Sequence, residues 1–153
     1  MTTGTGMLTR PFEDRDEGGV AALWREVFPD DPPWNEPTLV VEKKRAVQRE
    51  LFFITQIENE IVGTAMAGYD GHRGWVYAVA VKPGYRRRGV GRALMAKVES
   101  ALSECGCLKL NLQIRAGNEA VVKFYECLGY AIEPRTSMGK LLPPASALRT
   151  LSG

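Results

Sequence analysis

The stretch that decides the fold is WVYAVAVKPGYRRRGVGR, residues 75–92. It predicts an apolar strand over residues 75–81, then a short basic loop, and then a helix that begins near Val90. Pro83 and Gly84 end the strand, because proline cannot donate to a strand ladder and glycine accepts the backbone angles of a turn. The apolar residues that continue at helical spacing are Val90, Leu94, Val98, Ala101 and Leu102.

The loop before this helix has the composition of an anion-binding site. The first N–H groups of a helix lack acceptors within the helix and carry about half a positive charge. Gly89 and Gly91 have no side chains, so a ligand can approach these groups closely. Four arginines surround the same helix end: Arg86, Arg87, Arg88 and Arg92. We expect a phosphate or diphosphate ligand. The alternative is an ordinary solvated basic helix start in which the glycines only form a turn.

Two common phosphate-binding motifs do not fit this loop. A Walker motif requires a Lys-Ser or Lys-Thr pair, and none follows Gly89 or Gly91. A dinucleotide fingerprint that starts at Gly89 fails at Leu94, where it requires a third glycine. The pattern R/Q-x-x-G-x-G/A does fit, at Arg86, Gly89 and Gly91. With this pattern the chain resembles the GNAT superfamily of acyl-CoA-dependent N-acetyltransferases, whose loop of this form holds the diphosphate of coenzyme A.

Composition indicates an ordinary water-soluble domain. The 153 residues are 44% hydrophobic and 25% charged, and the formal net charge is only +2. Basic residues therefore matter only where they cluster, and a nucleic-acid contact through the arginines is a weak alternative without aromatic stacking residues beside them. We expect no secretory signal and no membrane span. We also expect no zinc site, because Cys105, Cys107 and Cys127 lie far in the sequence from the single histidine, His72. A cytoplasmic location is expected.

The rest of the chain predicts an α/β (α+β) fold. Strands are expected at residues 7–11, 51–57, 61–69, 75–81 and 108–114, with closing strands at Ile132 and at 137–141; helices are expected at 14–27, 38–49, 90–105 and 118–128. Residues 1–6 are expected to be disordered, 7–142 to form one domain, and 143–153 to form a flexible tail.

The order of these elements and the run from Asn118 to Tyr130 again resemble the GNAT fold. That fold implies a mixed, mostly antiparallel sheet of six to seven strands, flanked by about four helices, with a splayed parallel strand pair that holds the cofactor. The sequences PWNEP at 33–37 and GYDGHRG at 68–74 are similar to a small bacterial branch of the superfamily, the YpeA-like acetyltransferases.

The resemblance implies acetyl-CoA as the acyl donor, bound in a gap that opens after Val81 and after Leu112. The pantetheine arm would pair with backbone in the strand at 75–81, the diphosphate would bind the loop amides, and Asn118 would hydrogen-bond the arm. The strand can also serve as core, since backbone and side chains have different roles. The residues assigned to the cofactor are Val79, Ala80, Val81, Arg86, Arg87, Arg88, Gly89, Val90, Gly91, Arg92 and Asn118.

For catalysis the resemblance places Tyr125 as the general acid for the leaving sulfur, and we expect the N–H near Val79 to bind the oxyanion. The alternative for Tyr125 is a core aromatic beside Phe124. No general base is assigned: ribosomal-protein N-terminal acetyltransferases carry a glutamate five residues before the motif asparagine, and here that position is Gln113.

The acceptor is expected to be a primary amine of a small molecule or a protein. Candidate acceptor residues are Trp34, Tyr69, Asp70 and His72. Trp34 could instead pack its loop down, and residues 70–74 could be only a hairpin turn; Asp70 and His72 also stay open as relays to a base. The alternative function is a non-catalytic acyl-CoA binding module. The sequence does not decide between a monomer and a homodimer.

Overall fold

The computed structural model describes residues 6–146, which divide into two compact units, residues 6–116 and residues 117–146. The larger unit is built on a sheet whose strands lie in the order β1 (Met7–Pro11), β2 (Phe52–Ile57), β3 (Glu60–Tyr69), β4 (Gly74–Val81) and β5 (Leu110–Asn111). The pairs from β1 to β4 are antiparallel, and β4 pairs with β5 in parallel.

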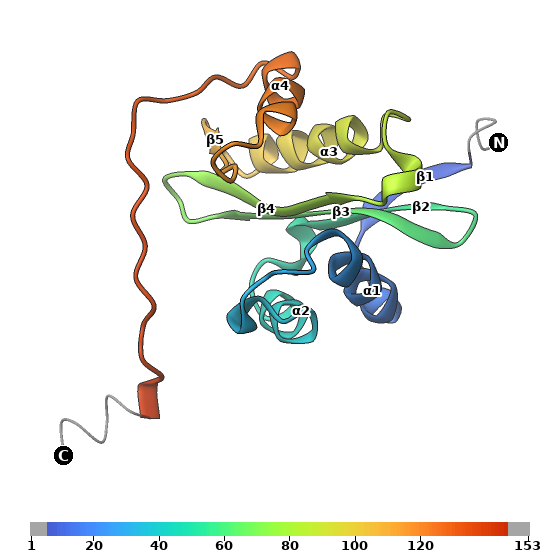
Figure 1. Ribbon diagram of the computed structural model, residues 1–153, viewed down its shortest axis with the longest axis horizontal. Coiled ribbons are helices and arrows are strands. Elements are labelled where there is room, and N and C mark those ends of the chain that lie inside the picture. The colour runs from blue at the N-terminus through green and yellow to red at the C-terminus, as the bar shows by residue number, and fades with distance from the viewer. Residues whose placement is uncertain (1–5, 147–153) are drawn as a thin grey trace. The chain divides into compact units, whose positions relative to one another are not determined.

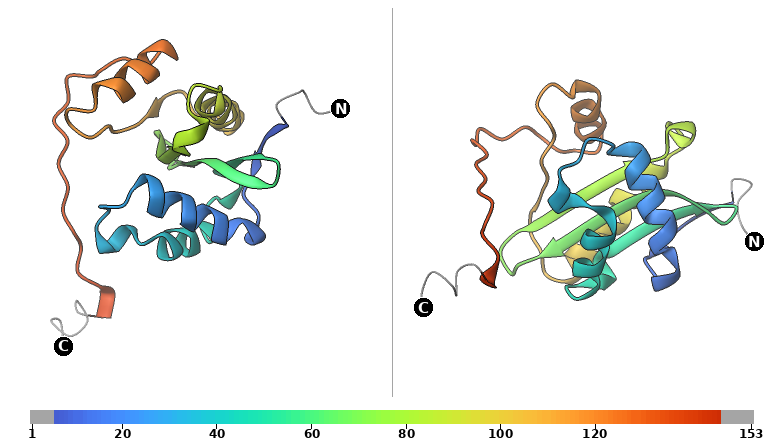
Figure 2. Two further views of the ribbon diagram at one scale, coloured as in Figure 1. Left: turned by 45° about the vertical axis from the view of Figure 1, so that its right-hand side comes forward. Right: turned by 60° about the horizontal axis from the view of Figure 1, so that its bottom comes forward.

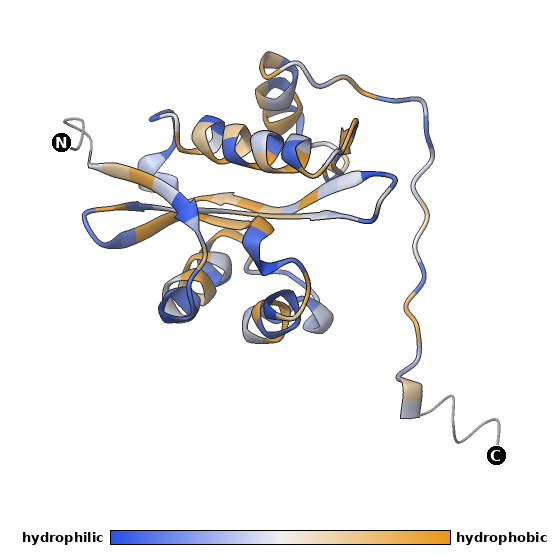
Figure 3. Cartoon of the chain, turned by 180° about the vertical axis from the view of Figure 1, so that it is seen from behind, coloured by the Kyte–Doolittle hydropathy of each residue, from blue (hydrophilic) through white to orange (hydrophobic). Residues whose placement is uncertain are grey.

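Helices cover both faces of this sheet. They are α1 (Glu17–Val27), α2 (Pro37–Arg45) and α3 (Val90–Glu104). Figure 1 shows α1 and α2 on one face and α3 on the other, and the turned views of Figure 2 show the same arrangement. The strands carry mostly apolar residues, whereas the helices alternate apolar and polar residues (Figure 3), as expected for a sheet that is buried on both faces.

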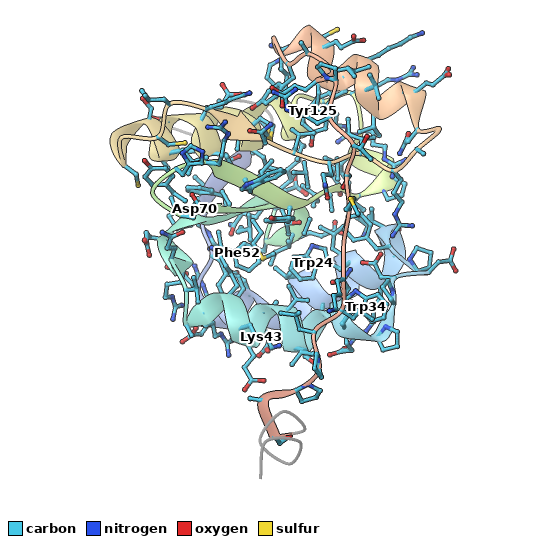
Figure 4. The ribbon with its side chains drawn as sticks, turned by 90° about the vertical axis from the view of Figure 1, so that its left-hand side faces the viewer. Trp24, Trp34, Lys43, Phe52, Asp70 and Tyr125 are labelled. Carbon is cyan, nitrogen blue, oxygen red and sulfur yellow. The ribbon has the colours of Figure 1, made fainter. Side chains whose placement is uncertain are left out.

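Aromatic stacking holds α1 on the sheet. The Phe52 ring stacks on the Phe12 ring at a centroid distance of 4.6 Å and on the Trp24 ring at 5.9 Å. Trp24 and Phe52 lie beside each other in Figure 4. The buried residues of this core cluster are Phe12, Val20, Leu23, Trp24, Val41, Phe52, Ile54 and Ala80.

A missing side chain on β3 lets α3 approach the opposite face closely. A Cβ at Gly63 would lie 2.6 Å from Val90 Cγ1 and 2.9 Å from Leu94 Cδ1, which is too close for any real carbon pair. Val90 is the first residue of α3. Gly63 therefore fixes the height at which α3 begins above the sheet.

We expect Gly63→Ala to lower the free energy of unfolding by about 1–3 kcal/mol, the usual cost of forcing an extra methyl group into a packed core. Gly68→Ala is the matched control on the same strand, since a Cβ there meets nothing closer than 3.4 Å. Urea denaturation of both variants measures the difference. Equal unfolding free energies would show that the start of α3 does not press on β3.

Most predicted elements of the larger unit are confirmed. The strand at residues 7–11 is correct, and the hairpin turn between β2 and β3 places Glu58 at φ 49° and Asn59 at φ 68°. The helix predicted at residues 14–27 begins as a 3-10 turn, Asp14–Asp16, and continues as α1.

The helix predicted at residues 38–49 ends earlier than expected, at Arg45. Gln48 takes a left-handed conformation with φ 50°. Its side-chain amide makes two hydrogen bonds of 2.8 Å to the backbone of Tyr69, one to the carbonyl and one from the N–H. A tertiary contact therefore ends the helical stretch, and the short helix Arg49–Leu51 follows.

The sheet has five strands in the described residues, so the expected six to seven was wrong. The strand predicted at residues 108–114 is only Leu110–Asn111, and Leu108 is 99% exposed. No strand forms in residues 131–146, where closing strands were expected at Ile132 and at residues 137–141. Ile132 and Met138 are 75% and 92% exposed, so no burial stabilises an extended ladder there.

The smaller unit contains α4 (Glu119–Cys127). Asn118 stands at the N-cap as predicted, although its side chain makes no capping hydrogen bond. Gly129 ends the helix with φ 95°, and the N–H of Tyr130 donates to the Tyr125 carbonyl at 3.0 Å. Disorder was expected at residues 1–6 and a flexible tail at residues 143–153, and of these segments residues 1–5 and 147–153 lie outside the described residues. No helix within residues 6–146 is long and apolar enough to span a bilayer.

Candidate active site

The arginine loop, residues 82–92, runs from the end of β4 into the first turn of α3. Pro83–Tyr85 form a 3-10 turn, and both Arg87 (φ 65°) and Gly89 (φ 83°) take left-handed conformations. Gly89 is the N-cap of α3 and has no side chain to satisfy the first helical amides. The N–H groups at the first three positions of α3, residues 90–92, therefore have no acceptor within the helix and are free to bind an anion.

The four arginines of this loop carry charges that the described part of the protein does not neutralise. Arg86, Arg87, Arg88 and Arg92 are exposed. None of them forms an ion pair with a carboxylate of residues 6–146, whereas other arginines of this region, such as Arg10 and Arg45, do. The Arg88 guanidinium lies over the Tyr85 ring, 5.0 Å from its centroid. The predicted anion site thus has backbone donors and unpaired charges together.

A β-bulge interrupts β4 just before this loop. Thr64 pairs with Ala80 and Met66 with Tyr77, so β4 has one residue more than β3 between these pairs. Ala78 has φ 50°, and the register gives neither Ala78 nor Val79 a partner on β3. A bulge re-aims the backbone groups beside it.

A buried threonine holds the bulge in place. Thr64 Oγ1 donates to the Ala78 carbonyl at 2.8 Å and accepts from Trp24 Nε1 at 2.8 Å. Thr64 is 0% exposed and Trp24 is 3% exposed. The Thr64 hydroxyl therefore links the Trp24 side chain of α1 to the bulged backbone of β4.

The parallel pair β4 and β5 separates soon after it begins. Gly74 pairs with Leu110 and Trp75 with Asn111, and the ladder ends there. β4 continues to Val81 with no further pairing on that side within the described sheet. The backbone of Val79, Ala80 and Val81, to which the sequence assigns the pantetheine arm, therefore lies along the unpaired part of β4. Ala80 is also buried in the core, and the role of this backbone in binding the pantetheine arm stays a prediction.

Tyr125 is buried within its surroundings, at 6% exposure. Its ring makes edge contacts with Phe124 at 5.0 Å and Tyr130 at 5.5 Å, both in the smaller unit. Burial raises the pKa of Tyr125 to about 12. The phenol therefore stays protonated at neutral pH and can serve as a donor. Its assignment as the general acid, like that of the exposed Asn118 as a cofactor ligand, stays a prediction.

Trp34 lies in the loop between α1 and α2, in the short helix Pro33–Asn35, and is 54% exposed. The loop is tied to the segment after β5, because Arg115 Nη2 donates to Asp31 Oδ1 at 2.6 Å. The carboxyl ends of parallel strands β4 and β5 lie at the same edge, so the loop reaches the edge at which these strands separate. An acceptor role for Trp34 stays a prediction.

Tyr69, Asp70 and His72 lie at the other end of β4. Asp70 Oδ1 accepts hydrogen bonds of 2.7 Å from the N–H groups of His72 and Arg73, and these bonds lower the pKa of the Asp70 carboxyl. At roughly 3.3 Å per strand residue, Gly74 is about 16 Å from Val79. The structure does not bring this turn to the bulge, and Figure 4 shows Asp70 well apart from Trp34. The roles proposed for these three residues remain predictions.

No local pattern in the sequence pointed to Thr64, Asp31 or Arg115. Each acts through a partner distant in the chain, and no local spacing reveals such a contact. A cavity of about 490 Å³ lies between α1 and the β2–β3 hairpin. Lys82, at the start of the arginine loop, lines this cavity, but none of the residues predicted to bind the cofactor does. No group of three or more His, Cys, Asp or Glu residues within residues 6–146 could hold a metal ion.

Comparison with known proteins adds a family match and related structures. The model described as "Acetyltransferase (GNAT) family" matches residues 20–130. An acetyltransferase of Yersinia pestis (strain Pestoides F) is 40% identical over 136 residues, 89% of this chain and 96% of the relative. The aminoglycoside N-acetyltransferase AAC(6')-Iy in complex with CoA has a TM-score of 0.75 at 19% identity, over 92% of this chain and 98% of that one. The ribosomal-protein-S18-alanine N-acetyltransferase from Escherichia coli has a TM-score of 0.65 at 26% identity, over 80% and 76%.

Proposed function

The chain belongs to the GNAT family of acetyltransferases and is an acyltransferase, and on this premise we propose that it transfers an acetyl group from acetyl-CoA to a primary amine. The amine attacks directly while both substrates are bound. The observation that carries the proposal is the arginine loop, in which exposed, unpaired guanidinium groups surround the free amides of α3. Their positive charge and N–H donors suit the negatively charged oxygens of the coenzyme A diphosphate.

The donor site follows the unpaired edge of β4. A pantetheine arm contains two amide groups that need hydrogen-bond partners, and backbone at Val79, Ala80 and Val81 supplies donors and acceptors in strand spacing. The diphosphate then reaches the arginine loop directly after this strand. The solved AAC(6')-Iy relative contains CoA, which supports a coenzyme A site in this chain.

The reaction forms one bond and breaks another at the acetyl carbonyl. The amine nitrogen bonds to the carbonyl carbon, the C–S bond breaks, and the amine loses a proton while the thiolate gains one. Negative charge develops on the carbonyl oxygen in between, and the N–H of Val79 in the bulge is the donor that we assign to it. Thr64 keeps the bulge in the required shape, and Tyr125 donates to the departing sulfur.

No carboxylate stands at position 113 to accept the amine proton. Deprotonating a lysine amine of pKa about 10.4 at pH 7 costs about 4.6 kcal/mol, whereas an α-amine costs about 1 kcal/mol. A less basic amine is therefore the easier acceptor. The free thiols Cys105, Cys107 and Cys127 favour a reducing, cytoplasmic setting.

A thiol-release assay with acetyl-CoA and a panel of primary amines tests this function. We expect stoichiometric release of the coenzyme A thiol with at least one class of amine, and mass spectrometry should find the acetylated product. Weakly basic amines should react at lower pH than lysine-like amines. Binding of acetyl-CoA without release of thiol from any amine would contradict the proposal and favour a binding module.

A further inference from the structure

Glu60 joins the β2–β3 hairpin to the arginine loop. It is the first residue of β3, and its carboxylate is shared between two loop side chains. One oxygen pairs with Lys82 Nζ, and the other accepts a hydrogen bond of 3.0 Å from the Tyr85 hydroxyl. The charge of Lys82 and the Tyr85 hydroxyl keep the pKa of Glu60 below its ordinary value, so the carboxylate is ionised at neutral pH.

Tyr85 passes this contact on to an arginine. Its hydroxyl is held by Glu60, and the face of the same ring lies under the Arg88 guanidinium at 5.0 Å. The backbone repeats the connection: the Tyr85 N–H donates to the Lys82 carbonyl at 2.8 Å, and the Lys82 N–H donates to Val62 at 2.8 Å. A continuous set of contacts thus leads from β3 to Arg88.

The arginine loop needs such an anchor. Arg87 is held at φ 65°, a conformation that is unfavourable for a residue with a Cβ. Three adjacent arginines also repel one another, and no carboxylate of the described residues pairs with them. Without a contact that fixes its side chain, Arg88 would lose more rotamer entropy when it binds an anion.

We propose that Glu60 and Tyr85 are positioning residues for diphosphate binding: Glu60 orients the Tyr85 ring, and the ring holds the Arg88 guanidinium where the anion binds. This inference rests on the proposed function, since the anion is the diphosphate of the acetyl donor. Glu60 and Tyr85 do not contact the reacting atoms. Their effect is on donor affinity, and the chemical step is independent of them.

Four variants of the full chain test this contact relay, that is, the contacts that lead from Glu60 through Tyr85 to Arg88. Tyr85→Phe removes the hydroxyl and keeps the ring, and Tyr85→Leu removes both. Glu60→Gln removes the charge that holds Lys82. Glu58→Gln is the matched control, because Glu58 lies on the same hairpin and is exposed without a hydrogen-bond partner among the described residues. Each protein is assayed with acetyl-CoA and with S-acetylpantetheine, a donor that lacks the diphosphate.

We expect Tyr85→Phe and Glu60→Gln to raise the Kd and KM for acetyl-CoA about three- to tenfold, and Tyr85→Leu to raise them about tenfold or more, because a charge-assisted hydrogen bond and a cation–π contact are lost in turn. The kcat at saturating donor should not change. The KM for S-acetylpantetheine should match that of the wild type and of Glu58→Gln in every variant.

Two results would contradict the proposal that Glu60 and Tyr85 position Arg88, while leaving the proposed function intact. In one, wild type and all variants bind acetyl-CoA equally well. In the other, the variants raise KM for S-acetylpantetheine by the same factor as for acetyl-CoA, which marks a general structural defect. A wild type that does not bind acetyl-CoA at all would instead refute the proposed function, and the relay with it.

Discussion

Gly89→Asp should weaken the binding of acetyl-CoA about a hundredfold or more, beyond the backbone strain that any side chain introduces at φ 83°. Gly89 is the N-cap of α3, and a Cβ there would meet no atom within 4 Å. The new carboxylate would stand among the amides that receive the diphosphate. Like charges about 5 Å apart at an effective dielectric constant near 20 repel by about 3 kcal/mol, which corresponds to roughly a hundredfold in Kd.

Gly89→Asn separates this charge effect from backbone strain. Asparagine has the shape of aspartate and the same difficulty at φ 83°, but it carries no charge. Isothermal titration calorimetry should therefore give the Gly89→Asn variant a Kd for acetyl-CoA between those of wild type and Gly89→Asp. Because a negative charge at a helix N-terminus is stabilising, the melting temperature of Gly89→Asp should be at or above that of Gly89→Asn. Equal affinities of the two variants would mean that the bound group at this helix end is not an anion.

Tyr125→Phe should lower kcat at least about tenfold while the Kd for acetyl-CoA changes little, because the variant removes one proton donor to the leaving sulfur and keeps the ring. With the pKa of Tyr125 raised to about 12, complete transfer to a thiolate of pKa about 8.5 is uphill by about 5 kcal/mol. A strong hydrogen bond to the developing thiolate is therefore the expected role. Its loss should lower kcat by the same factor at about pH 7 and about pH 10, since the phenol stays protonated at both values.

Tyr130→Phe is the matched control for this variant. Tyr130 makes the same kind of edge contact with Tyr125 that Phe124 makes, and the substitution removes a hydroxyl from the same aromatic group. We expect its kcat to lie within about twofold of wild type, as for a hydroxyl outside the chemical step. If Tyr125→Phe also turned over like wild type, Tyr125 would be a core aromatic and the proton donor would have to lie elsewhere.

The local signals in the sequence predicted most of the larger unit. Pro83 and Gly84 marked the end of β4, and helical spacing after Val90 marked α3. Gly89 takes a left-handed conformation and α3 starts without a side-chain cap; that this helix end binds an anion stays a prediction. These features depend on neighbours within a few residues, so they can be read from the chain itself.

Features that depend on distant contacts could not be predicted in this way. The bulge at Ala78 requires Thr64 from the adjacent strand, and the end of α2 depends on the two hydrogen bonds between the Gln48 side chain and the Tyr69 backbone. Alternating leucines after Cys107 suggested a long strand, but β4 offers β5 partners only at Gly74 and Trp75. Apolar alternation shows what a segment could bury and not whether a partner strand is present.

Titration calorimetry of the full chain with acetyl-CoA and with S-acetylpantetheine tests the central claim most directly, namely that the arginine loop binds the diphosphate of the acyl donor. We predict measurable heat with acetyl-CoA, an affinity that falls as salt is added because the arginines are exposed, and binding of the truncated donor that is weaker by about a hundredfold or more. Equal affinity for the two donors, or no heat with acetyl-CoA, would contradict the account.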